Sequence, residues 1–211
     1  MLIDIVSDAV CPWCYIGKRR LEAALAARPE LSVEIVWHAF QLNPGMPEEG
    51  MDRERYLATK FGSAARAASI YNDIEQAGAD VGIAFAFDSI QRTPSTINAH
   101  RLILLAGKHD VQDAVVEALF RRYFREGADI GDLGLLVTVA AEAGIDAALA
   151  RDYLESSEGV EEVIGEDRRM RQIGVTGVPC FIIDKHYAIS GAQAPEVFQR
   201  IFDTAVADSA E

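Results

Sequence analysis

The sequence predicts an α/β fold in which a small mixed β-sheet is interrupted by a large all-helical insertion. Strand-like segments lie near both ends of the 211-residue chain, whereas the middle consists of consecutive segments with the hydrophobic spacing of helices. No flexible linker flanks this helical middle. We therefore expect a sheet-containing domain made of residues 1–45 and 158–211, with an inserted helical domain at 46–157.

The opening of the chain reads as strand, helix, strand. Residues 2–7 form a short β-branched run, and Pro12 suits the first position of a helix, where a missing N–H costs nothing. The apolar face of that helix should end near Pro29, and residues 31–40 alternate like a second strand. A strand–helix–strand unit predicts a right-handed crossover with the two strands parallel.

The rest of the chain reads as the helical block, one further helix and a closing unit. Two strands, at 178–183 and 187–190, are separated by a hairpin-length link. Pro195 then opens a last helix that should reach about Val206. The helices expected in the block span residues 52–62, 63–77, 95–107, 110–126, 132–143 and 146–156.

Composition and charge restrict the function classes. A net charge of −13 repels phosphate backbones and anionic headgroups, so we expect neither nucleic acid nor a membrane as partner. The first residues lack the pattern of a secretory signal, and no apolar run approaches the roughly 20 residues of a spanning helix. A cytoplasmic location is expected. Three cysteines do not form a paired disulfide framework, and close-spaced cysteines in a reducing compartment are more often catalytic or metal-binding.

The strongest chemical signal is Cys11-Pro12-Trp13-Cys14, between the first strand and the first helix. The unpaired N–H groups of a helix N-terminus stabilise a thiolate, which is the nucleophile of disulfide exchange. We expect Cys11 at the exposed end of the helix as nucleophile, and Cys14, one turn along, as the resolving thiol. Pro12 pre-sets the helix start, and Trp13 offers a flat apolar surface for docking a substrate.

Other interpretations of the cysteine pair carry less weight. A zinc site needs two further cysteine or histidine ligands at short spacing, and no second pair exists. The strand before the motif and the helix after it argue against two unrelated cysteines. We expect no metal and no tightly bound cofactor. The histidines are scattered over His38, His100, His109 and His186.

Two segments carry a resemblance to a known family. Residues 7–17, Ser-Asp-Ala-Val-Cys-Pro-Trp-Cys-Tyr-Ile-Gly, and residues 174–179, Gly-Val-Thr-Gly-Val-Pro, resemble the DsbA-like branch of the thioredoxin superfamily. The match is closest to its FrnE-like subgroup, which is related to 2-hydroxychromene-2-carboxylate isomerases. Further matching segments, in order along nearly the whole chain, are residues 40–44, 92–94, 99–102, 118–120 and 190–193.

The resemblance implies a thioredoxin-like fold with a large all-helical insertion. It also implies that Val178-Pro179 is a cis-proline loop beside Cys11, in which the backbone of Val178 pairs with an extended substrate. Asn43 could line the substrate cleft, although a turn-making role is equally compatible with its position. His100 is implied to lie near the cleft, although a packed, hydrogen-bonded histidine is the more common role.

The chain departs from the family at two points. Thioredoxins often bury a carboxylate six residues before the first cysteine, and Ile5 stands there instead. Asp4 belongs to the opposite face of the strand and Asp8 lies nearby, so no proton acceptor for Cys14 is obvious. The second departure is Cys180, directly after Pro179, which reads as a buried small hydrophobe or, less often, as a third redox-active thiol.

Three functions are compatible with these residues. The preferred one is a thiol–disulfide oxidoreductase or isomerase that acts on proteins or small molecules bearing disulfides, with glutathione as a potential co-substrate. The alternative is a glutathione-dependent isomerase of 2-hydroxychromene-2-carboxylate or polyketide-like aromatic substrates, whose relatives carry a single serine or cysteine at the helix start. A non-catalytic binding module is the third, against which the intact cysteine pair argues. The helical surfaces of residues 95–126 could support a homodimer.

Overall fold

The fold is built on a four-stranded mixed sheet. The computed structural model describes residues 1–208, with the backbone alone at Ala64. Strands follow the order β2-β1-β5-β6: β1 and β2 are parallel, while β5 is antiparallel to both β1 and β6. This arrangement confirms the predicted thioredoxin-like sheet and the parallel opening pair. The strands are β1 (Leu2–Ser7), β2 (Glu34–Ala39), β5 (Cys180–Ile183) and β6 (Tyr187–Ser190).

Every predicted helix is present, with ends shifted by a few residues. A small second sheet, formed by β3 (Met51–Asp52) and β4 (Arg92–Thr93), was not predicted, because two-residue strands leave no periodicity to detect. The helices are α1 (Pro12–Ala26), α2 (Arg53–Phe61), α3 (Ala64–Ala79), α4 (Ile97–Gly107), α5 (Gln112–Phe124), α6 (Leu133–Glu142), α7 (Ala147–Glu155), α8 (Val160–Gln172) and α9 (Pro195–Asp208), with a 3-10 turn η1 (Phe87–Ser89).

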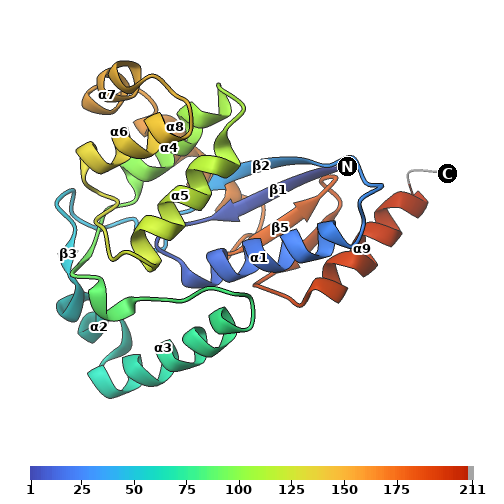
Figure 1. The fold of residues 1–211 in the computed structure, drawn as a ribbon, viewed down its shortest axis with the longest axis horizontal. Coiled ribbons are helices and arrows are strands. Elements are labelled where there is room, and N and C mark those ends of the chain that lie inside the picture. The colour runs from blue at the N-terminus through green and yellow to red at the C-terminus, as the bar shows by residue number, and fades with distance from the viewer. Residues whose placement is uncertain (209–211) are drawn as a thin grey trace.

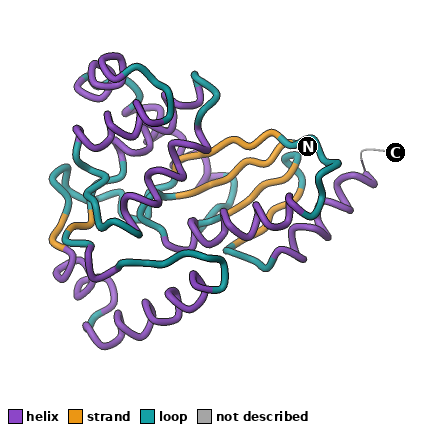
Figure 2. The backbone as a smooth tube through the Cα atoms, in the orientation of Figure 1, coloured by secondary structure: helices purple, strands orange, loops and turns teal. Residues whose placement is uncertain are grey.

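Helices cover both faces of the central sheet. Helices α1 and α9 pack side by side on one face (Figure 1). The rings of Phe181 in β5 and Phe198 in α9 meet there, with their centres 4.9 Å apart. On the other face, Met170 of α8 packs with Val6 and Phe40. Helices α2 to α7 gather at one end of the sheet, as the backbone trace also shows (Figure 2). Among the described helices, none is both long and apolar enough to cross a membrane.

Short polar side chains separate the helices of the insertion. Asp52, Ser63, Asp132 and Asp146 each accept a hydrogen bond from a backbone N–H in the first turn of the helix that follows. Such N-caps satisfy donors that the helix itself leaves unpaired. Gly62 ends α2 in the left-handed region at φ 79°, a conformation that glycine adopts without strain. These four caps and the Gly62 helix end thus mark where several helices of the block begin or end.

Side chains close the outer edge of β2. The Gln112 side chain accepts from the backbone N–H of Trp37 at 3.0 Å, and Glu166 and Asp167 of α8 accept from Ala39 and Gln41, each at 2.8 Å. Unpaired strand edges invite pairing with other chains, so this capping protects β2. It also anchors α5 and α8 to the sheet.

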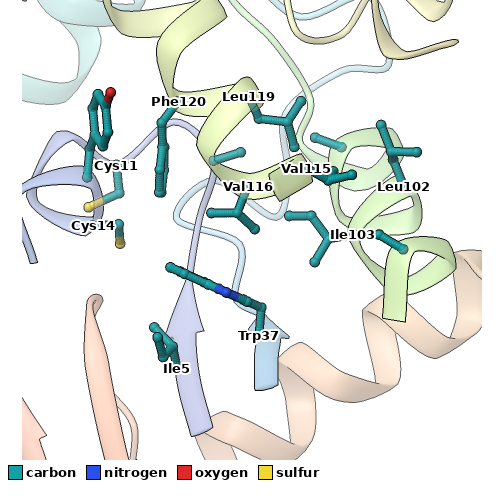
Figure 3. Packing of buried hydrophobic residues seen from close by; sticks show 14 of the residues in the cluster. Ile5, Cys11, Cys14, Trp37, Leu102, Ile103, Val115, Val116, Leu119 and Phe120 are labelled. Atoms are coloured by element: carbon teal, nitrogen blue, oxygen red, sulfur yellow. The ribbon is translucent and has the colours of Figure 1, made fainter. Parts of the chain in front are cut away.

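The insertion and the sheet share one apolar core. Figure 3 shows this core running from Cys11 and Cys14 past Phe120 of α5 to Ile103 of α4, with Trp37 contributed by the sheet. The boundaries predicted for the insertion, residues 46–157, stay a prediction. Helix α8 lies outside these boundaries and packs both on α4, which lies inside them, and on β2.

Candidate active site

The cysteine motif lies at the N-terminus of α1. Cys11 is the N-cap residue, with an extended backbone at φ −96° and ψ 110°, and Pro12 opens the helix. The Cys11 N–H donates to the Asp8 carbonyl at 3.0 Å, and the Cys14 N–H donates to the Cys11 carbonyl at 3.0 Å. No side chain caps this helix start. Cys11 therefore lies at the positive end of the α1 dipole, with no side chain capping the helix there.

Cys14 is the deeper of the two thiols. It is 1% exposed, and burial raises the pKa of its thiol well above the ordinary value. A hydrogen bond to Cys11 and the charge of Cys11 raise the pKa of Cys14 further, whereas the Ser7 hydroxyl and the Asp8 backbone N–H lower it. Both cysteines are free thiols here. The contact between the two sulfurs is what a resolving pair requires.

The expectation that Cys11 forms an exposed end of the helix is wrong: the residue is only 4% exposed. The Val178 carbonyl accepts a hydrogen bond from the Cys11 thiol at 3.7 Å, and the sulfur also belongs to the core shared with the insertion. Local helix position alone could not reveal this cover, which comes from segments distant in sequence. Trp13, in contrast, is 37% exposed and forms the outer surface of the motif.

The loop before β5 lies directly against α1. The Val178–Pro179 peptide bond is cis, and the loop carbonyl of Val178 contacts Cys11. Gly17 permits this approach, because a Cβ at that position would lie 3.0 Å from both Pro179 Cγ and Phe181 Cζ. A side chain at position 17 would therefore press on the cis-proline loop and on the Phe181 ring.

Asp8 and His100 form a buried polar pair beside the motif. Asp8 is fully buried and His100 is 3% exposed, and Nε2 of His100 lies 3.3 Å from Oδ1 of Asp8, although the geometry is not that of a hydrogen bond. The other Asp8 oxygen accepts from the Leu42 N–H at 2.8 Å. The structure therefore brings His100 of the insertion to the segment that carries Cys11. Sequence reasoning placed Asp8 near the motif but missed its contact with His100.

Asn43 lies at a separate hollow. Its side-chain oxygen accepts from the Tyr56 hydroxyl at 3.3 Å, and Lys60 Nζ donates to the same hydroxyl at 2.6 Å. The hollow measures about 330 Å³. Asn43 is therefore bound to α2 rather than only shaping a turn, and it lines a cavity without direct contact to Cys11 in this structure. The other lining residues are Gly45, Met46, Met51 and Thr59.

Cys180 lies on the far face of the sheet. It pairs in register with Val6 and packs with Met170 and Val175, on the face covered by α8, whereas Cys14 belongs to the core on the α1 face. Burial raises the pKa of its thiol. This position fits the interpretation of Cys180 as a small core residue.

Metal ligation has no site in the part of the chain that the structure describes: no group of three or more His, Cys, Asp or Glu side chains is placed to hold an ion. Both ring nitrogens of His38 are instead hydrogen-bonded to carboxylates, with Nδ1 2.8 Å from Glu166 and Nε2 2.7 Å from Asp4, so neither nitrogen is free to bind an ion.

Comparison with known proteins identifies close relatives. The model of the DSBA-like thioredoxin domain family matches residues 2–203. A probable DsbA oxidoreductase, SCO1869 from Streptomyces coelicolor, is 35% identical, with a TM-score of 0.89 over 98% of this chain and 90% of its own.

Two further solved structures share the fold at lower identity. A 2-hydroxychromene-2-carboxylate isomerase is 15% identical, with a TM-score of 0.73 over 100% of this chain and 98% of its own. The cytosolic disulfide reductase DsbM from Pseudomonas aeruginosa, solved with GSH, is 18% identical, with a TM-score of 0.62 over 98% of this chain and 99% of its own.

Proposed function

Because the chain belongs to the DSBA-like thioredoxin domain family, whose members include thiol oxidoreductases, we propose that it is a thiol–disulfide oxidoreductase in which Cys11 and Cys14 are the reactive pair. The observation that carries this proposal is the contact between the two thiols at the start of α1, with the Val178 carbonyl 3.7 Å from the Cys11 sulfur. Cys11 is the nucleophile and Cys14 the resolving thiol.

The first step is attack by the Cys11 thiolate on a substrate disulfide. One substrate sulfur bonds to Cys11, and the other leaves as a thiolate. The positive end of the α1 dipole stabilises the thiolate before attack. The Val178 carbonyl, beside Cys11, and the exposed Trp13 are the proposed docking contacts for the segment that flanks the substrate disulfide.

The second step is attack by Cys14 on the sulfur of Cys11. The Cys14 thiol loses its proton, the Cys11–Cys14 disulfide forms, and the second substrate sulfur leaves as a thiolate. The substrate has then gained two electrons and the protein has lost two. The Ser7 hydroxyl and the Asp8 N–H, both hydrogen-bonded to Cys14, support the charge that develops on its sulfur.

Glutathione is the proposed co-substrate that returns the pair to the dithiol form. One glutathione thiolate attacks the Cys11–Cys14 disulfide and forms a mixed disulfide with Cys11, and a second glutathione releases Cys11 and leaves with the first as glutathione disulfide. The structure of DsbM, which shares the fold, was solved with GSH, and this supports the choice. A reducing cytoplasm is the compartment in which such a cycle runs toward net reduction or isomerisation. The substrates proposed are proteins or small molecules that carry disulfides.

The test is glutathione-dependent reduction of insulin and of a small disulfide by single-cysteine variants. Cys11→Ser should abolish turnover, and Cys14→Ser should accumulate a mixed disulfide on Cys11 that mass spectrometry detects. Cys180→Ser is the matched control, since it removes a buried thiol on the opposite face, and it should keep turnover. Activity that survives the loss of Cys11 would refute the proposal.

A glutathione-dependent isomerase of aromatic substrates is the alternative. It requires Cys11 but not Cys14, so isomerisation of 2-hydroxychromene-2-carboxylate that persists in Cys14→Ser would favour it. The intact pair argues for the redox function first.

A further inference from the structure

Arg53, the first residue of α2, is a buried cation without an anionic partner. It is 8% exposed and donates to the Thr93 hydroxyl at 3.1 Å and to the Tyr71 hydroxyl at 2.8 Å. Its guanidinium also lies 5.1 Å from the ring centre of Tyr71 and 5.7 Å from that of Tyr56. None of the ion pairs among the described residues involves it.

A buried charge of this kind is costly to the fold. Hydroxyl groups and ring faces satisfy part of the guanidinium, but they supply no negative charge to compensate for lost hydration. Arginine also carries a planar fork of donors that matches a carboxylate. The surroundings of Arg53 therefore lack a negative charge, which an anionic ligand would supply.

A cavity opens beside this guanidinium. It measures about 730 Å³ and lies between α2 and α3, with Leu57, Tyr71 and Phe87 as its apolar and aromatic wall. Glu54, Glu75 and Asp88 also line it, but all three are exposed, so that water and salt screen their charges. Arg53 is the one buried charged group on this wall. A carboxylate on an apolar or aromatic body matches these surroundings.

The cavity is linked to the cysteine motif by packed rings. Tyr15, the residue after Cys14, lies 6.3 Å from Phe85, which stacks on Phe87 at 4.6 Å, and Phe87 meets Tyr71 at 4.6 Å (ring centres). The wall of the cavity is thus continuous with the first turn of α1.

The charges that act on Tyr71 also relate the cavity to the cysteine motif. Burial is the main cause that raises the pKa of Tyr71, the Arg53 guanidinium lowers it, and a charge on Cys11 raises it. The charge on Cys11 is the smallest of these causes, so the ring contacts carry the link between the cavity and the motif.

We propose that Arg53 binds a carboxylate of the substrate, and that the substrate class is a small disulfide with an apolar or aromatic body, held in this cavity while its sulfurs meet Cys11. The inference rests on the proposed function and narrows it. The near-complete burial of Cys11, at 4% exposure, favours a small disulfide over a globular protein. In the reaction, each half of the disulfide leaves as a thiolate, and the two electrons come from the Cys11–Cys14 dithiol.

Two chromogenic disulfides test the proposal on the reduced full-length protein. 5,5′-Dithiobis(2-nitrobenzoate) carries one carboxylate on each aromatic ring, whereas 4,4′-dithiodipyridine is aromatic and lacks one. Stopped-flow measurement gives the second-order rate constant for each. In Arg53→Met, the ratio of the nitrobenzoate rate to the pyridine rate should fall about tenfold or more, since a hydrogen-bonded charge is lost. Taking the ratio cancels any change in the reactivity of Cys11 itself.

Two variants control for charge and shape. Arg55→Gln removes the same charge from an exposed position two residues further along α2, outside the cavity, and should leave the ratio within twofold of wild type. Arg53→Lys keeps the charge but loses the planar fork, and its ratio should lie between those of wild type and Arg53→Met. In wild type, 2-nitrobenzoate should slow the reaction with the carboxylate disulfide, and nitrobenzene should not.

The outcomes separate the two proposals. A wild-type protein that fails to react with either disulfide through Cys11 would overturn the proposed function. Normal reaction with dithiodipyridine, together with an unchanged ratio in Arg53→Met, would overturn the carboxylate site alone. If Arg53→Met does not fold, protection by 2-nitrobenzoate in wild type decides the question: equal effects of 2-nitrobenzoate and nitrobenzene would overturn the site.

Discussion

Release of the substrate from the mixed disulfide should depend steeply on pH. The attacking group is Cys14, which is 1% exposed, and burial is the largest cause of the raised pKa of its thiol. In the mixed disulfide Cys11 no longer carries a charge. The two effects of Cys11 on the pKa of Cys14, its hydrogen bond and its charge, then disappear, and burial remains as the cause that raises this pKa. Since only a thiolate attacks, the reactive fraction of Cys14 is small at neutral pH.

The size of the effect follows from the titration. An ordinary cysteine is only a few per cent thiolate at pH 7, and a raised pKa lowers that fraction. Below the pKa of Cys14, the thiolate fraction rises tenfold for each unit of pH. The rate constant for release should therefore increase about tenfold per pH unit between about pH 6 and 8, without a plateau.

The hydroxyl of Ser7 provides a matched perturbation. Its hydrogen bond lowers the pKa of Cys14, so Ser7→Ala should raise that pKa and slow release at pH 7 by about tenfold, as for a hydrogen bond to a charged group. The slope with pH should stay the same. Cys14→Ser should abolish release at every pH.

The assay begins from protein in which Cys11 is joined to thionitrobenzoate. Release of the coloured thiolate is followed by stopped flow from pH 5.5 to 9, with its extinction calibrated at each pH. A rate constant that levels off below pH 7 would refute the reasoning, because it would mean that Cys14 is deprotonated at neutral pH despite its burial. Release from Ser7→Ala that equals wild type would refute the assigned role of the hydroxyl.

Three further predictions concern the scaffold around the site. Arg101 is 2% exposed and donates to the backbone carbonyls of residues 153, 154, 156 and 158 at the end of α7. Arg101→Met should therefore lower the free energy of unfolding by about 3 kcal/mol in denaturant titrations. A loss no larger than that of Arg151→Met, on the exposed face of α7, would contradict this. His38 binds two carboxylates, which raise its pKa against the opposing effect of burial, while the pKa of Glu166 is lowered, mainly by the hydrogen bond from His38 against burial. The His38 contribution to stability is present at low pH and is lost as pH rises through its folded pKa, whereas the Glu166 contribution is lost as pH falls. The difference in unfolding free energy between wild type and His38→Gln should therefore peak between about pH 4.3 and 6.5 and be smaller at pH 8. A difference independent of pH would refute the linkage. Gly17→Val places methyl groups against Pro179 and Phe181, so it should destabilise the fold by about 1–3 kcal/mol and slow the reaction of Cys11 with dithiodipyridine; unchanged stability would show that the loop yields without cost.

Local patterns in the sequence predicted most of the elements correctly, because each pattern is created by short-range physics. Asp52, Asp132 and Asp146 are N-caps, because their side chains accept from first-turn N–H groups, and Gly62 ends α2 in the left-handed region, because it has no Cβ. The β-branched run of residues 2–7 and the alternation of residues 31–40 predicted two strands, which form a parallel pair. The two-residue strands at Met51 and Arg92 escaped detection, since their pairing is decided by contacts distant in sequence.

The site was predicted less completely. The Cys11–Cys14 spacing and the family resemblance predicted a reactive pair, which stays a proposal, and the structure adds the contact of Cys11 with Val178. The burial of Cys11 was not foreseen, because the segments that cover it come from the other end of the chain and from the insertion. The contact of Asp8 with His100 likewise joins residues that only tertiary packing brings together.

The sequence by itself determined which residues carry the proposed chemistry: the spacing of Cys11 and Cys14 and their place at the start of a helix are both local properties. Tertiary structure alone decided the environment of those residues. It set the depth of Cys14, the closeness of the Val178 loop and the position of Arg53 beside an aromatic cavity. Burial and electrostatic fields are sums over neighbours in space, and the order of residues along a chain does not specify which neighbours those will be.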